Sequence, residues 1–395
     1  MSKPVFRILA AALAAGGLQL HAVTPEAAVS AALVPGADFF AYANSAKIQN
    51  SPFVKHIENL AKSESPVPIE ALLETPQFAP FKSAIDKFTG NSLKQASASG
   101  VFTSLASYSF DNNGLLVCLV FEKPVDKAAL RELVTAFGKF AGEAIDSIPN
   151  ADKNVTDFFG RVKNRLQLSD LTHGGATGIN VAYKLLNDPD DPVLSLALLA
   201  DNKVLYVGFE QTVKAAIDRA NDGKQAPVSK KFASLFAPNF GGARFAQYDA
   251  CGIFVIPVAL RYLIAEIEPA IADQIPPGFQ SAANAVKGLQ GWRFAYACGD
   301  KLDVAFSVLL NDPGRASALK EFLEINFIGL AKAQLFQFAG KNTAFAESLA
   351  ANATANATSI QFTVTTADID FFVELAKKQL GDTPLPFFND EDDGE

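Results

Sequence analysis

The sequence has little sulfur and little histidine, and each scarcity excludes a chemistry. Met1 is the only methionine among 395 residues, so the rest of the chain has no thioether that could bind a soft metal. His56 and His173 are the only histidines beyond residue 22. A His-rich metal site is therefore excluded, and catalysis that depends on histidine is restricted to two candidates.

Motifs of known catalytic sites are absent as well. The sequence contains no H-E-x-x-H, C-x-x-C or EF-hand pattern. His173-Gly174-Gly175 resembles the oxyanion-hole turn of esterases, but no G-x-S-x-G nucleophile motif follows it. We therefore expect no catalytic, cofactor-binding or metal-binding residues. A hydrolase of unrecognised type around His173 stays open as an alternative.

Positive charge is scarce too. The chain has 34 Lys and Arg against 42 Asp and Glu, a formal net charge of −8. Nucleic acid and anionic lipid headgroups are poor partners for such a surface. Charged residues make up 19% and hydrophobic residues 49% of the chain, which favours a folded protein over a disordered one.

The first 22 residues are typical of a secretory signal peptide. Lys3 and Arg7 form a short positive region, Ile8–Leu20 is apolar, and Ala22 ends a small-residue cleavage site. The apolar run is too short to span a bilayer permanently. We expect export to the periplasm or the extracellular space, with no transmembrane anchor once the signal is removed.

Three cysteines remain in this exported chain. Cys118 lies in the apolar run Leu115–Phe121, which predicts a buried strand and an inert thiol. Cys251 and Cys298 each end a strand-like segment in the second half. Because the expected compartment is oxidising, these two residues are the candidates for a disulfide.

The sequence contains weak internal repeats. Three segments of the first half match three of the second in the same order: Ala37–Tyr42 with Ala243–Tyr248, Leu115–Phe137 with Val304–Asn326, and Val204–Ala220 with Ile360–Ala376. Within the second pair, Pro124 and Pro313 align and each is expected just inside a helix start. The matches predict a duplicated unit with insertions in one copy.

The hydrophobic patterns indicate the architecture of that unit. Leu130, Leu133, Val134 and Phe137 recur at helical spacing, whereas the last strand around Ile360–Val364 alternates apolar and polar residues. Alternation predicts one buried and one wet face. We therefore expect an α+β fold of two similar halves, each a mainly antiparallel sheet covered on one face by helices.

Composition suggests the divisions of the chain. We expect a signal peptide at 1–22, a first α+β repeat with insertions at 23–225, a second repeat at 226–385 and an acidic disordered tail at 386–395. The polar stretch Ala350–Thr358 is expected to be a linker.

Two segments carry a resemblance to a known group of proteins. The opening Val34-Pro35 with the strand around Phe39–Ala43, and the strand-then-helix unit after Tyr206-Val207-Gly208, resemble a family of exported bacterial proteins of unknown function, of planctomycete and verrucomicrobial type. The resemblance implies an envelope or secreted location. It implies no activity and no catalytic residue.

These observations leave three functional hypotheses. The chain has 33 Phe and one Trp, a composition typical of a dry core and compatible with an apolar cavity. The first hypothesis is a non-enzymatic exported protein that binds another protein or an extracellular polymer through a free sheet face or edge. The alternatives are a carrier of an apolar ligand or lipid, which requires a Phe-lined pocket, and the hydrolase around His173.

Overall fold

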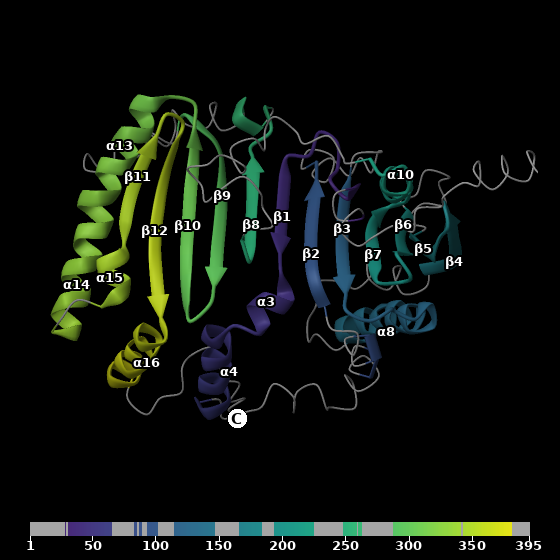
Figure 1. The fold of residues 1–395 in the computed structure, drawn as a ribbon, viewed down its shortest axis with the longest axis horizontal. Coiled ribbons are helices and arrows are strands. Elements are labelled where there is room, and N and C mark those ends of the chain that lie inside the picture. Colours follow the sequence, from purple (N-terminus) through teal and green to yellow (C-terminus); the bar gives the residue numbers. More distant parts are fainter. Residues whose placement is uncertain are drawn as a thin grey trace, which may run out of the picture.

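The computed structural model contains one continuous sheet with helices around it (Figure 1). It describes residues 28, 31–64, 83–84, 87–88, 93–101, 114–146, 166–183, 193–224, 248–258, 260–262, 287–340 and 343–380. The strands are β1 (Phe39–Ala43), β2 (Leu93–Gly100), β3 (Leu115–Phe121), β4 (Leu166–His173), β5 (Ala176–Tyr183), β6 (Val193–Leu199), β7 (Val204–Phe209), β8 (Ala250–Val255), β9 (Leu289–Cys298), β10 (Lys301–Leu310), β11 (Ala350–Thr354) and β12 (Ala357–Thr365).

The helices lie at the flanks and ends of this sheet. They are α3 (Ser45–Gln49), α4 (Pro52–Glu64), α8 (Lys127–Asp146), α10 (Glu210–Asn221), α13 (Pro313–Leu323), the π-helical turn η5 (Glu324–Ile328), α14 (Gly329–Ala339), α15 (Ala344–Ser348) and α16 (Thr366–Leu380). The predicted start of α13 is confirmed, since Pro313 is its first residue and the Asp312 side chain accepts from Arg315 N. The helix after Pro124 begins later than expected, at Lys127, because Asp126 caps it by accepting from Ala128 N at 3.0 Å.

The twelve described strands form one sheet in the order β11-β12-β10-β9-β8-β1-β2-β3-β7-β6-β5-β4. Every strand pair is antiparallel. The predicted α+β class with a mainly antiparallel sheet is confirmed. The two sides do not form separate sheets, because β1 and β8 pair with each other and so cover what would otherwise be two exposed edges.

The strand order on the two sides of the central β1–β8 pair corresponds. Outward from β1 lie β2, β3, β7 and β6, and outward from β8 lie β9, β10, β12 and β11. Helices α8 and α13 follow β3 and β10, and helices α10 and α16 follow β7 and β12. Asp38 O accepts from Val255 N at 2.7 Å, and Asp249 O accepts from Asn44 N at 2.6 Å. The residue before each central strand therefore accepts a backbone hydrogen bond at the end of the other strand.

The helices pack on both faces of the sheet, which differs from the one-sided cover that we expected. Face A carries the side chains of Phe39, Ala41 and Ala43, and face B those of Phe40 and Tyr42. Helix α8 packs on face A through a cluster with β5, β6 and β7, whereas α10 packs on face B through a cluster with β3, β6 and β7. Both parities of β6 and β7 are apolar, so both faces need cover.

A segment near the N-terminus closes part of face B. Ala28, Ala31 and Val34 are fully buried in the main core cluster. Tyr206 Oη donates to Ala28 O at 2.5 Å, and Arg219 Nη2 donates to Ala31 O at 2.9 Å. Residues directly after the predicted signal peptide are therefore part of the core.

Most of the predicted domain boundaries lie outside the residues that the structure describes. Residues 1–22, the boundary between residues 225 and 226, and the tail 386–395 lie outside the described residues. The linker expected at Ala350–Thr358 is wrong, since this stretch forms β11, a turn and the start of β12. Its small polar residues belong to an edge strand, where side chains alternate between sheet and solvent.

Candidate functional site

The middle of face A is the part of the described chain most suited to binding. Here Phe39, Phe254, Trp292, Phe294 and Phe306 lie on neighbouring strands and on the same face, and we call this set the aromatic floor. Trp292 and Phe306 are each 39% exposed, and the other three are half-buried. The Phe254 and Trp292 rings stack with centroids 4.5 Å apart.

The residues that surround the floor are also apolar. From β10 to β3 the register places Val, Ala, Gly and Leu residues and Tyr296 beside the five aromatic residues on face A, with no charged side chain among them. Glycine makes room for two of the rings. A Cβ at Gly252 would lie 2.5 Å from Phe294 Cε1, and one at Gly100 would lie 2.9 Å from Phe39 Cε1.

The floor is bounded on its two sides by helices. Helix α8 packs against β5, β6 and β7, and α13 packs against Val308 and Leu310 of β10 and against β11. The strands β10 and β3 lie roughly 24 Å apart at about 4.8 Å per strand, and the two helices cover one end of each, with β9, β8, β1 and β2 between them. An exposed face of an antiparallel sheet is normally polar, so this arrangement suits contact with an apolar partner.

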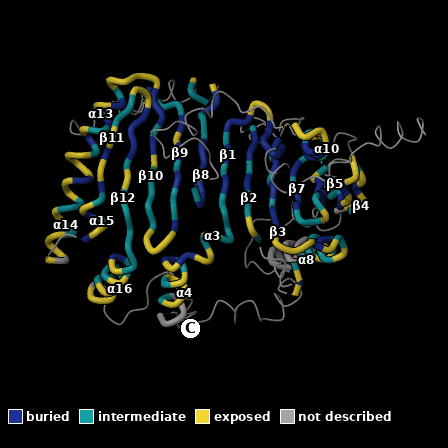
Figure 2. The backbone as a smooth tube through the Cα atoms, in the orientation of Figure 1, coloured by how far each residue is buried: buried dark blue, intermediate teal, exposed yellow. Residues whose placement is uncertain are grey.

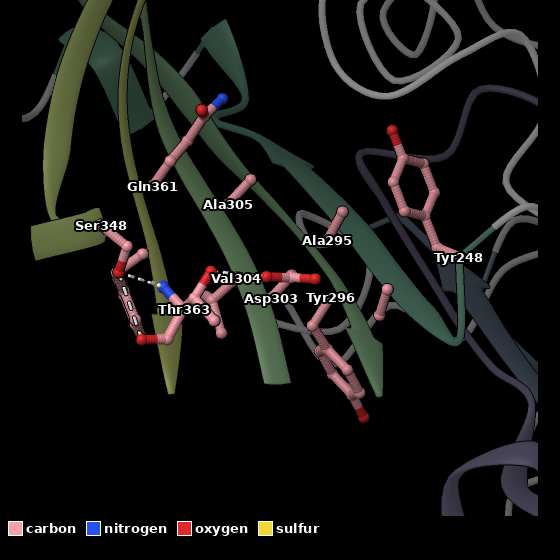
Figure 3. A pocket seen from close by; sticks show the side chains of 11 residues that line it. Tyr248, Ala295, Tyr296, Asp303, Val304, Ala305, Ser348, Gln361 and Thr363 are labelled. Carbon is pink, nitrogen blue, oxygen red and sulfur yellow. Dashed lines mark hydrogen bonds between the residues drawn. The ribbon is translucent and has the colours of Figure 1, made fainter. Parts of the chain in front are cut away.

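A second concave feature lies on face B of the second half. It is a recess of about 300 Å³ on strands β9, β10 and β12, with Tyr248 at its side (Figure 3). Gln361, Ala305 and Ala295 form one row across the three strands. Of its lining residues, Phe362 is the only phenylalanine, so the recess differs from the Phe-lined cavity expected of a carrier.

Several polar groups of the recess are hydrogen-bonded to each other. Thr363 Oγ1 donates to Asp303 Oδ1 at 2.6 Å, and Ser348 Oγ accepts from Thr363 N at 2.8 Å (Figure 3). Beside the recess, burial lowers the pKa of Arg293 to about 10, and burial raises the pKa of Tyr248. Since Asp303 and Ser348 bind neighbouring strands, these groups stabilise the local sheet.

The disulfide predicted between Cys251 and Cys298 is wrong, because all three cysteines are free. Cys251 pairs with Ala295 across β8 and β9, and Cys298 lies three residues further along β9. An odd separation along a strand places the two thiols on opposite faces of the sheet, out of bonding reach. Burial raises the pKa of Cys118 to about 12, which agrees with the inert thiol expected there.

Both histidines of the described chain are oriented by aspartates. His173 Nε2 lies 2.8 Å from Asp218 Oδ1, and His56 Nε2 lies 2.7 Å from Asp370 Oδ1. Within the described residues, neither ring contacts a hydroxyl or a thiol that could act as nucleophile. His173 belongs to the β4–β5 hairpin, where Gly174 and Gly175 take the positive φ values of a tight turn.

In the described part of the chain, no group of three or more His, Cys, Asp or Glu residues is placed to hold a metal ion. The acidic turn at residues 188–191 lies outside this part. None of the helices in the described part of the chain has both the length and the apolar character to cross a bilayer.

Comparisons with known proteins show distant structural similarity alone. No protein-family model and no curated protein matches the chain. The chain is similar to TP0453 in crystal form I, with a TM-score of 0.36 and 10% identity over 90% of this chain and 98% of that chain. Crystal form III gives a TM-score of 0.35 and 10% identity over 88% and 97%, respectively. The resemblance to exported planctomycete- and verrucomicrobial-type proteins stays a prediction.

Sequence reasoning did not find the aromatic floor. The phenylalanine content predicts a core but places no individual ring, and no motif in the sequence singles out Trp292. A signal was present, because β1 and β3 carry apolar side chains at both parities. That pattern indicates a strand with two apolar faces, each of which must be covered by another element or by a partner.

Proposed function

We propose that this protein is an exported, non-enzymatic binding protein whose aromatic floor holds an apolar segment of a partner protein. The observation that carries the proposal is the floor itself, a sheet face without charge whose Trp292 and Phe306 are each 39% exposed. Aromatic residues at the centre of an apolar patch are the usual energetic anchors of protein interfaces. Charged groups on this face lie away from the floor, for example Asp170 of the edge strand β4 with Lys127 and Arg131 in the first turns of α8.

The width of the floor suits an amphipathic helix. About 24 Å lies between β10 and β3, and a helix with its side chains is about 10–12 Å wide. Helices α8 and α13 already pack on the same face at either side. A partner helix lying between them would continue the same layer and use the same kind of contact.

Trp292 provides the test, because it is the only tryptophan of the chain and it belongs to the floor. Titration of the purified chain with a synthetic Leu/Gln amphipathic helical peptide is expected to shift Trp292 emission to the blue with saturation. The Phe306→Ala variant is expected to weaken binding about ten-fold, since it removes an aromatic contact of about 1.4 kcal/mol. Phe336→Ala is the matched control, because Phe336 is 53% exposed on α14, which packs on β11 and β12 and not on the strands of the floor.

A carrier of an apolar ligand is the second candidate, and the same apolar floor favours it. Oleate in place of the peptide distinguishes the two. Saturable oleate binding reported by Trp292, with no response to the peptide, would support the carrier and contradict the partner-binding proposal. No change of Trp292 emission with either probe would contradict both.

A further inference from the structure

The sheet has two edges, and they differ in length and in cover. At one end lies β11, a strand of five residues whose Ala351 and Ala353 pack against η5 and α13. At the other end lies β4, a strand of eight residues (Figure 1). Four residues of β4 are exposed (Figure 2), namely Gln167, Ser169, Asp170 and Thr172. The longer edge is therefore the open one.

The backbone of β4 is paired on one side. Among the described residues its partner strand is β5, which it joins through a two-residue glycine turn with positive φ. Such a turn closes on a residue pair whose backbone groups bond each other, here His173 and Ala176. Because these groups alternate along an antiparallel strand, those of Thr172, Asp170 and Leu168 face away from β5. No described residue bonds them there.

An edge of this kind matches an extended polypeptide chain. Its N–H and C=O groups recur at the spacing of another strand, and pairing with such a strand satisfies them. Proteins usually block a long edge with proline, lysine, a bulge or a covering element. The β4 sequence contains no proline and no lysine, and its register with β5 continues without a bulge from Leu166 to His173.

The charges beside this edge indicate which side chains an added strand should carry. Asp170 Oδ1 lies 2.7 Å from Arg131 Nη2 and 3.2 Å from Lys127 Nζ, on face A. The neighbouring Glu132 is paired with Lys87 at 2.7 Å. Two partly exposed cations against one carboxylate leave an excess of one positive charge next to β4. A carboxylate on the added strand balances this excess.

We propose that β4 binds an extended segment of a partner protein, which pairs with its backbone and places an acidic side chain beside Lys127 and Arg131. The same charge excess disfavours a second copy of this chain, because pairing β4 with itself sets two positive clusters side by side. The site is separate from the aromatic floor, since β7, β6 and β5 lie between β3 and β4. The inference therefore does not rest on the proposed function of the floor.

Binding of a strand-forming peptide to the purified full-length chain tests the proposal. The probe is a fluorescein-labelled synthetic peptide of four Thr-Val repeats in which glutamate replaces the second threonine, and fluorescence anisotropy measures its binding. Saturable binding with a Kd of about 10–100 µM is expected. The absence of saturable binding up to about 300 µM of the chain would overturn the proposal.

N-methylation of the peptide shows whether backbone pairing is responsible for the binding. One peptide variant is methylated on the alternate amide nitrogens of one edge of its extended chain, and the other variant on those of the opposite edge. Since one edge faces β4, one variant is expected to bind about ten-fold more weakly and the other within about two-fold of the parent peptide. Equal affinities of the two variants would contradict pairing at a sheet edge.

Two substitutions at Thr172 give a matched pair in the chain itself. Thr172→Pro removes an outward N–H at an edge position and leaves the ladder with β5 in place, so it should weaken binding of the parent peptide about ten-fold. Thr172→Val keeps this N–H and should bind as the wild type does. Urea denaturation establishes that both variants are folded. Equal binding by the two folded variants would overturn the proposal.

The acidic side chain of the occupant has its own test. Lysine in place of the glutamate of the peptide is expected to weaken binding about five-fold at low ionic strength, and Arg131→Gln should reduce this preference. A lysine peptide that binds as tightly as the glutamate peptide would contradict the proposed charge of the occupant.

Two further measurements separate this site from other occupants and from the floor. A doubled mass in sedimentation equilibrium without peptide, lost in Thr172→Pro, would overturn the proposal in favour of a second copy. Phe306→Ala should leave binding of the strand peptide unchanged, because Phe306 belongs to the aromatic floor. A loss of binding in Phe306→Ala would place the peptide on the floor and overturn the inference.

Discussion

At the scale of single residues, burial determines the chemistry of this protein. Cys118 and Cys251 are buried within the main cluster. Tyr206 is fully buried and donates its hydroxyl hydrogen to Ala28 O. Burial raises the pKa of each of these groups because it disfavours the anion, so the folded chain keeps protons that the unfolded chain releases.

We expect the free energy of unfolding to fall between pH 9 and pH 12. Burial raises the pKa of the Cys118 and Cys251 thiols from 9.0 to about 12. In this window the unfolded chain has lost thiol protons that the folded chain retains, so stability that is complete below pH 9 is lost as the pH rises. Each thiol contributes a slope of about 1.4 kcal/mol per pH unit.

Urea denaturation at pH 8, 9, 10 and 11 measures this slope. Cys118→Val removes one of the two thiols and should make the decline shallower. Equal free energies at pH 8 and pH 11 would contradict the expectation.

At the scale of elements, turns and strand pairings determine which segments lie next to each other. The β4–β5 hairpin presents His173 beside Gly174 and Gly175, whose φ values are +52° and +80°. The β9–β10 hairpin turns at Gly299, whose φ is not in the left-handed region. The two turns therefore offer a matched comparison between a strained and an unstrained position.

Gly175→Ala is expected to destabilise the chain by about 1–2 kcal/mol, because an L-residue at positive φ places its Cβ against the backbone. Gly299→Ala is expected to be near neutral, since no atom lies within 4 Å of its added Cβ. Urea denaturation of the two variants checks the difference. Equal losses of stability would show that the hairpin turn is not constrained by its φ.

Several elements could be predicted from the sequence because local signals determine them. The predictions that were wrong depended on how distant strands pair. The buried strand β3 and the start of α13 were predictable because a continuous apolar run and a proline at a helix start act locally. The disulfide failed because it depends on which face each cysteine occupies once β8 pairs with β9. The aromatic floor was missed for the same reason, since Phe39 and Phe254 become neighbours only through the β1–β8 register.

At the scale of the whole molecule, one sheet joins both sides of the chain. The central β1–β8 pair contributes five registered residue pairs, from Phe39 with Phe254 to Ala43 with Ala250. Buried residues of β1, β3, β8, β9 and β10 belong to a single core cluster. Loss of structure on one side therefore exposes apolar surface on the other.

We expect one cooperative unfolding transition. Trp292 emission reports on the second half alone, and far-UV circular dichroism reports on both halves, so the two urea curves should coincide. Ala41→Pro should lower the midpoint of both curves, because proline in a central strand removes a ladder hydrogen bond. Separate wild-type curves would indicate two independently folding halves.

The buried residues Ala28, Ala31–Val34 and Ala37 have a consequence for the order of assembly. During synthesis they emerge well ahead of their partners: Ala28 precedes Tyr206 by 178 positions, and Ala31 precedes Arg219 by 188. These residues can therefore reach their places in the core only after more than half of the polypeptide has been made. The core that they complete closes late in the synthesis of the chain.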